Sequence, residues 1–166
     1  MPMRIHLPCW VSETRQTASL TFDLDRDEEF DRRLSGWARL EMADFVFEGP
    51  SYMEGALLLD WLGQLQLMTT GHCQEAVLWD WDRQKCVSLR SASQGLPYPV
   101  RVACQWAGFY GAADPEEIQR EYLPGAALCL SLSGLRADSD QVPRLIEQVS
   151  LVLEKTGVST ERIIIS

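Results

Sequence analysis

The sequence contains very little lysine: Lys85 and Lys155 stand against thirteen arginines. Its 24 acidic residues outnumber its 15 basic ones, and the formal net charge is -9 at pH 7. Nucleic-acid binding usually depends on a basic surface that contacts phosphates. We therefore predict no nucleic-acid partner, and we favour a partner with a basic surface, because an acidic shell attracts cations and speeds their arrival.

Histidine is as scarce as lysine, with only His6 and His72. A zinc site usually takes four nitrogen or sulfur ligands in recognisable pairs, and these two residues with their cysteine neighbours do not supply them. The segment from Asp23 begins like a calcium loop, but Glu28 and Leu34 stand where that loop needs glycine and a bidentate glutamate. We predict no metal site and no cofactor.

Catalytic motifs are also missing. The sequence has no G-x-S-x-G, no cysteine-centred signature and no glycine-rich phosphate loop. A nucleophilic Cys73 or Cys104 served by a distant histidine is conceivable, but buried cysteines and structural histidines explain these residues better. We therefore assign no catalytic residue from motifs.

The five cysteines are odd in number, widely spaced and without a C-x-x-C pair, which is typical of reduced thiols in a cytosolic protein. No stretch of about 18 apolar residues exists that could span a membrane. The apolar start of the chain is broken by His6 and Pro8, so we expect no signal peptide. These features predict a cytoplasmic protein with no membrane contact.

What is present is the composition of a globular protein, with 46% hydrophobic and 23% charged residues. The length of 166 residues suits one domain, which we place at 1–166. Apolar alternation predicts strands at 3–7, 18–24, 44–49, 99–109, 125–134 and 161–166, and a hairpin over 76–90. Apolar residues at helical spacing predict helices over 28–42, after Asp114 and over 139–156.

These elements predict the α+β class: a single domain with a mostly antiparallel sheet packed by two or three helices. Residues 54–68 fit a helix or a strand, and we favour strand for their second half because Gly63 weakens a helix. The oligomeric state stays open.

The densest chemical feature is an acidic run of six carboxylates within nine positions: Asp23, Asp25, Asp27, Glu28, Glu29 and Asp31. Asp25 or Asp27 could cap the helix predicted over 28–42, because a short side-chain oxygen accepts free N–H groups of the first turn. The helix dipole would favour the acids that follow. About half of the run is thereby explained by helix initiation, and the rest is free to meet a partner.

A second feature is the sequence WDWD at 79–82. On a strand, Trp79 and Trp81 share one face while Asp80 and Asp82 share the other. Paired carboxylates can perform acid–base chemistry, but at a hairpin end we expect both to be solvated. Tryptophan beside acids also suits a binding surface.

The two ends of the chain carry a resemblance. The segment ALCLSLSGLRADSDQVPRLIEQVSLVLEKTGVSTERIIIS is similar in outline to the strand–helix–strand half of a tautomerase-superfamily protein, and the chain begins Met1-Pro2. The resemblance implies that Pro2, exposed by removal of Met1, would act as the catalytic base. It covers about a quarter of the chain, and residues 8–125 do not repeat the unit.

The poor catalytic inventory and the rich surface inventory favour a non-enzymatic acidic binding protein. Small acidic single-domain proteins of this character resemble bacterial immunity proteins, which neutralise a toxin or enzyme by occluding its basic active site. We expect such an inhibitor, with an assembly or chaperone-like subunit or the Pro2 enzyme as alternatives. The predicted partner-binding residues are Asp23, Asp25, Asp27, Glu28, Glu29, Asp31, Trp79, Asp80, Trp81 and Asp82.

Overall fold

The computed structural model describes residues 3–26, 33–43, 45–80, 85–92, 95–107 and 129–157. They form a mixed α+β structure with one eight-stranded sheet, in which every adjacent pair of strands is antiparallel, and two helices. The sheet is larger than the sequence led us to expect. The expected helix after Asp114 and the expected strand at 161–166 lie outside the described residues.

The strands follow the order β4-β3-β2-β1-β8-β7-β6-β5. Each half of the sheet is built from strands consecutive in the sequence, and α1 connects the two edge strands β4 and β5. The bounds are β1 Met3–Val11, β2 Thr17–Arg26, β3 Arg33–Met42, β4 Phe45–Glu54, α1 Gly55–Thr69, β5 Glu75–Trp79, β6 Lys85–Arg90, β7 Val100–Ala107, β8 Cys129–Ala137 and α3 Gln141–Thr156.

The sheet is folded over on itself. Strands β2 and β7 are three places apart, which in a flat sheet would separate them by about 14 Å. The rings of Phe22 on β2 and Trp106 on β7 nevertheless have centroids 6.2 Å apart. Strands β4 and β6 are six places apart, yet the Nζ of Lys85 donates a hydrogen bond of 2.7 Å to the Pro50 carbonyl. The two halves therefore face each other across a shared core.

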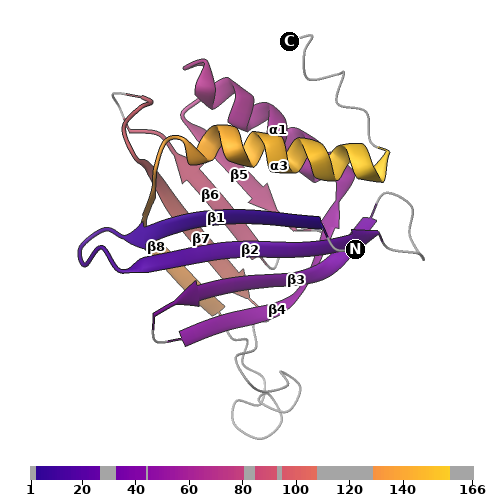
Figure 1. Cartoon of the computed structure of the whole chain (residues 1–166), viewed down its shortest axis with the longest axis horizontal. Helices are drawn as coiled ribbons and strands as arrows, with labels where there is room; N and C mark the ends of the chain where they lie inside the picture. The colour runs from indigo at the N-terminus through magenta and orange to yellow at the C-terminus, as the bar shows by residue number, and fades with distance from the viewer. Residues whose placement is uncertain are drawn as a thin grey trace, which may run out of the picture.

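Figure 1 shows this arrangement: β1–β4 cross in front of β5–β8, and the two helices lie together along one side. Both helices bury an apolar stripe against the core, with Leu58, Trp61, Leu62, Leu65 and Met68 from α1 and Val142, Leu145, Val149, Val152 and Leu153 from α3. The helix expected over 139–156 is confirmed, and Gly157 ends it in the left-handed conformation (φ 78°). Neither helix has the length and apolar character to cross a membrane, judged over the described part of the chain.

The helix predicted over 28–42 is wrong where the structure describes it, because 33–42 is strand β3. Its inward side chains alternate as Leu34, Ala38 and Leu40, with Gly36 between the first two. Glycine and alanine add little to the apolar pattern of the inward face. Trp37 faces outward, yet in the sequence it falls at helical spacing and therefore favoured the wrong prediction of a helix. Asp25 lies within β2 and caps no helix.

Two further predictions need correction. The second half of 54–68 is helix rather than strand, because α1 runs unbroken to Thr69. Strand β4 does not close at Gly49–Pro50 but continues to Glu54. The hairpin over 76–90 and the strands near 3–7 and 18–24 are confirmed, and the strands expected at 99–109 and 125–134 are confirmed where the structure describes them, as β7 and β8.

Candidate functional site

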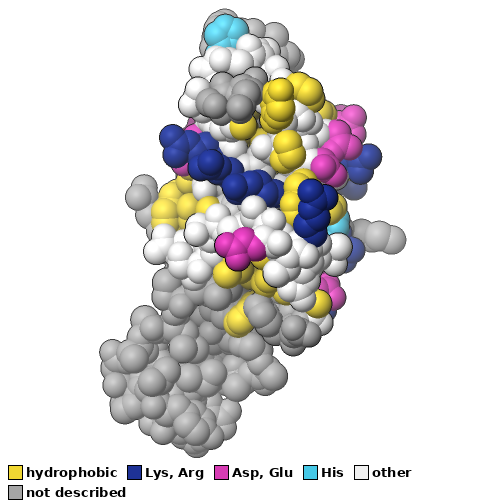
Figure 2. All heavy atoms as spheres, turned by 90° about the vertical axis from the view of Figure 1, so that its left-hand side faces the viewer, with side chains coloured by type: hydrophobic (Ala, Val, Ile, Leu, Met, Phe, Trp, Pro, Cys, Tyr) yellow, Lys and Arg dark blue, Asp and Glu magenta, His cyan; other side chains and the backbone are white. Residues whose placement is uncertain are grey.

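Charged side chains are distributed unevenly over the two halves of the sheet. On the outer face of the β5–β8 half, Arg136 of β8 lies opposite Arg101 of β7, and Arg101 lies opposite Arg90 of β6. We name these three residues the arginine row. Figure 2 shows basic side chains gathered in a continuous band on the side of the molecule where β8 lies.

The outer face of the β1–β4 half is different in character. We name it the Trp37 face and define it by the outward side chains of these four strands. In strand order, Arg4 lies opposite Asp23, Asp23 opposite Trp37, and Trp37 opposite Pro50. Trp37 is 56% exposed, which makes it the most exposed large hydrophobic residue among those described.

Carboxylates outnumber guanidinium groups on the Trp37 face. Its acids are Asp23, Asp25, Glu41, Glu48 and Glu54, and its arginines are Arg4, Arg33 and Arg39. The arginines are engaged within the face: Arg39 lies 3.9 Å from Glu41, and the Arg33 guanidinium lies 4.4 Å above the Tyr52 ring. Such local engagement leaves the negative character of Asp25 and Glu48, both exposed, to dominate the surface near Trp37.

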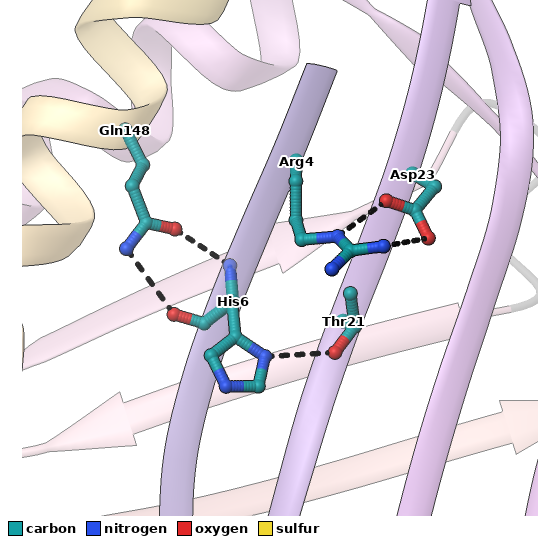
Figure 3. Close-up of polar contacts among 5 residues, drawn as sticks. All are labelled: Arg4, His6, Thr21, Asp23 and Gln148. Atoms are coloured by element: carbon teal, nitrogen blue, oxygen red, sulfur yellow. Dashed lines mark hydrogen bonds and ion pairs between the residues drawn. The ribbon is translucent and has the colours of Figure 1, made fainter. Parts of the chain in front are cut away.

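Figure 3 shows how one part of this face is organised. Arg4 donates two hydrogen bonds to the Asp23 carboxylate, from Nε to Oδ1 at 2.7 Å and from Nη2 to Oδ2 at 3.3 Å. This fork holds both side chains flat along the strands, beside Trp37, and gives the carboxylate a defined position. His6 Nδ1 and Thr21 Oγ1 are hydrogen-bonded at 2.9 Å in the next row.

The same view shows how α3 is fixed to β1. Strand β1 pairs with β8 only at Trp10 and Val11, so the backbone of its first residues lacks a partner strand on that side among the described residues. The side-chain amide of Gln148 takes the place of a partner strand at His6. Its Oε1 accepts a hydrogen bond from the His6 N–H at 2.6 Å, and its Nε2 donates one to the His6 carbonyl at 3.3 Å. The start of β1, which carries Arg4, is thereby fixed.

The predicted partner-binding residues are only partly brought together. Asp23 and Asp25 lie on β2 and point outward on the Trp37 face. Asp27, Glu28, Glu29, Asp31, Trp81 and Asp82 lie outside the described residues, as does Pro2, so their roles stay predictions.

Trp79 and Asp80 stand at the end of β5, and they differ in exposure. Trp79 is half-buried. Asp80 is only 1% exposed, which corrects the expectation of a solvated carboxylate. Its Oδ1 accepts the Lys85 backbone N–H at 3.0 Å, so the carboxylate closes the hairpin.

Trp79 nevertheless lines a cavity of about 320 Å³. Glu54 and Asp60 contribute carboxylates to its wall, and Gln64 and Val77 complete the side between α1 and β5. Glu54 also ends β4, so the cavity borders the Trp37 face. An aromatic ring beside carboxylates is suited to a cationic group such as a lysine or arginine side chain.

Metal and nucleophile chemistry find no support in the described part of the chain. It contains no group of three histidine, cysteine or acidic residues placed to hold a metal ion. Burial raises the pKa of Cys9 and of Cys104 to about 12, so both thiols are neutral near pH 7 and poor nucleophiles. Burial, with help from Glu75 and Asp80, raises the pKa of Cys86 to about 11.

Sequence reasoning missed Trp37, because it placed residues 28–42 in a helix rather than in a strand. The signal that could have found it is the alternation of Leu34, Gly36, Ala38 and Leu40, which places residue 37 on the opposite face of a strand. Comparison with known proteins adds no further assignment: no protein family, no curated protein and no solved structure matches this chain.

Proposed function

We propose that this chain is a non-enzymatic acidic binding protein that captures a basic protein partner on the Trp37 face. The observation that carries the proposal is the exposure of Trp37 at 56% in the middle of a four-stranded face with a surplus of carboxylates. Tryptophan is enriched among the residues that dominate binding energy at protein–protein interfaces.

The mechanism is capture by charge followed by desolvation of the ring. The net charge of -9 and the acids around Trp37 steer a cationic surface towards the face. Trp37, with Pro50 beside it and the Tyr52 ring in the neighbouring row, then supplies the apolar contact. The Arg4–Asp23 pair beside Trp37 is already ordered by its two hydrogen bonds, which lowers the ordering cost of binding at this part of the face.

The cavity beside Trp79 adds specificity to this scheme. A lysine or arginine of the partner enters it between Glu54, Asp60 and the Trp79 ring, next to the edge of the Trp37 face. In the finer form of the proposal, the partner is a toxin or enzyme with a basic active site, and the chain is a cytoplasmic immunity-type inhibitor that occludes it. A lysine or arginine side chain of the partner's active site would then occupy this cavity.

The test compares partner capture by the wild-type chain and by Trp37→Ala in extracts of the native host. We expect one basic protein to bind the wild type at low salt, to be lost with Trp37→Ala, and to be retained by Tyr98→Ala. Tyr98 is a suitable control because it is 52% exposed and lies outside β1–β4.

Association rate constants are then measured with the purified partner. Asp25→Asn with Glu48→Gln should lower the association rate constant about tenfold at low ionic strength, with a smaller effect at high salt. Glu147→Gln with Glu154→Gln, which removes the same charge from exposed positions on α3, should change it far less. Capture of the basic partner by Trp37→Ala as well as by the wild type, or loss of an acidic partner with Trp37→Ala, would overturn the proposal. Loss of the partner's catalytic activity in the complex would establish the inhibitor form.

A further inference from the structure

The arginine row is the least expected arrangement of charge among the residues that the structure describes. Three arginines lie directly opposite one another on the adjacent strands β8, β7 and β6, in a chain whose net charge is -9. Arg90 and Arg101 are exposed and Arg136 is half-buried. Like charges directly opposite each other on neighbouring strands oppose folding.

The row is not neutralised within the described residues, where none of the three arginines lies in an ion pair. Arg136 Nη1 donates a hydrogen bond of 3.3 Å to the carbonyl of its own neighbour, Leu135. Glu75 lies opposite Arg90 at the far end of the row, beyond the last arginine, without an ion pair to it. The central Arg101 has an arginine on each side.

The geometry points to an external acidic ligand, and we propose that the arginine row binds an acidic α-helix of a partner protein laid across the strands. Neighbouring strands are about 4.8 Å apart, so the three arginines span about 9.6 Å. Helix positions i, i+3 and i+7 share one face and rise about 4.5 and 10.5 Å along the axis. Three carboxylates at these positions therefore meet the three guanidinium groups in order.

An extended acidic peptide fits less well. Its side chains on one face repeat every 6.6 to 6.8 Å, so three carboxylates span about 13 Å and run out of step with the row. Nucleic acid is disfavoured because its phosphates continue beyond the three arginines, where the acidic rest of the chain repels them, whereas the helix needs only three carboxylates at the row itself. Arginine also matches carboxylates better than lysine does, because its planar fork forms two parallel hydrogen bonds.

The two ends of the row define a sequence pattern for the helix. Beyond Arg136 the next residue across the strands is Trp10, which is half-buried. Beyond Arg90 the next residue is Glu75. The matching stripe is therefore an apolar residue, three carboxylates and a basic residue, at positions 1, 5, 8, 12 and 15 of a helix.

The test uses a fluorescent helical peptide with leucine, three glutamates and lysine at these positions, and fluorescence anisotropy at low and at physiological salt. We expect it to bind the wild-type chain and to lose about tenfold in affinity for Arg101→Gln. A peptide with glutamine in place of the three glutamates should not bind. Arg144→Gln is the matched control, because it removes an exposed arginine from α3 and should leave the affinity within twofold.

A second measurement addresses the like charges directly. Arg101→Gln should raise the melting temperature of the free chain by about 1–3 °C, because it removes two unfavourable neighbours at once. A fall would mean that the row stabilises the fold, and it would overturn the proposal.

The proposal also fails if the glutamate peptide does not bind or binds Arg101→Gln equally well. It fails too if a single-stranded oligothymidine binds the row more tightly than the peptide, because the row would then be a phosphate site. Trp37→Ala should bind the peptide normally, so a failure of the proposed function on the Trp37 face would leave this result unchanged.

Discussion

At the scale of single residues, two glycines of the sheet, Gly36 in β3 and Gly134 in β8, have opposite requirements. A Cβ placed on Gly36 in β3 would overlap the backbone carbonyl oxygen of Asp23 in β2. Backbone cannot move aside as the end of a flexible side chain can, so β2 and β3 can pair here only if residue 36 has no side chain. A Cβ on Gly134 in β8 would meet nothing within 4 Å.

We predict that Gly36→Ala lowers the free energy of unfolding by about 3 kcal/mol, through the cost of overpacking against backbone. Gly134→Ala should change it by less than about 0.5 kcal/mol, in line with an open surface position. Urea denaturation of both variants measures the difference. Equal midpoints would show that β2 and β3 separate at little cost. Because Gly36 pairs beside Trp37, a destabilised Gly36→Ala should also weaken capture of the partner on the Trp37 face.

At the scale of elements, the sequence correctly predicted the helices and strands whose apolar pattern fits only one type of secondary structure. The hairpin over 76–90 and α3 were recognised because strict alternation and a clean helical stripe leave no competing assignment. Segment 33–42 failed because its buried face is made partly of Gly36 and Ala38, while its largest apolar side chain, Trp37, faces solvent. The burial of a strand face is decided by the partner sheet, which no local pattern contains.

Helix α1 illustrates the second kind of failure. Its segment is apolar on several sides, so helix and strand patterns match it equally well, and only the packing against α3 and β5 selects the helix. The candidate site shares this limit. The acids Asp23 and Asp25 could be found in the sequence, whereas their alignment with Trp37 depends on the register between β2 and β3.

Two adjacent residues of α1 separate the helical assignment from the strand assignment. In the helix Met68 is 3% exposed and Leu67 is 41% exposed, whereas a strand would place residue 67 on the same buried face as Trp61 and Leu65. We predict that Met68→Ala lowers the free energy of unfolding by about 2–4 kcal/mol and Leu67→Ala by less than about 1 kcal/mol. Thermal and urea unfolding give both values. The reverse order would contradict the packing of α1 described here.

At the scale of the whole molecule, the fold depends on contacts between two half-sheets that are far apart in strand order. Phe22 meets Trp106, Lys85 meets the Pro50 carbonyl, and the helices cover one side of the shared core. This arrangement leaves two outer faces of different sign on one small chain. The two proposals therefore predict that the Trp37 face and the arginine row bind a basic and an acidic partner at the same time, with contact between the two sites limited to Trp10 at their border.

The buried thiols report on whether the two halves stay together. Cys9 belongs to β1 and Cys104 to β7, and burial raises the pKa of each to about 12 from an ordinary value of 9.0. A raised pKa in the folded state contributes stability below the unfolded-state pKa, and this contribution is lost as pH rises towards the folded-state value. We therefore predict that the urea midpoint falls between pH 9 and pH 12.

Comparison with Cys9→Ala/Cys104→Ala isolates the thiols, because tyrosines and lysines titrate equally in both proteins. The double variant should start from a lower midpoint, since two buried side chains are shortened, but it should decline less steeply with pH. If the urea midpoints of the two proteins fell in parallel with rising pH, the thiols would ionise as readily in the folded chain as in the unfolded one. That result would be incompatible with two half-sheets closed over a dry core, so the slope of one curve tests the closure of the whole fold.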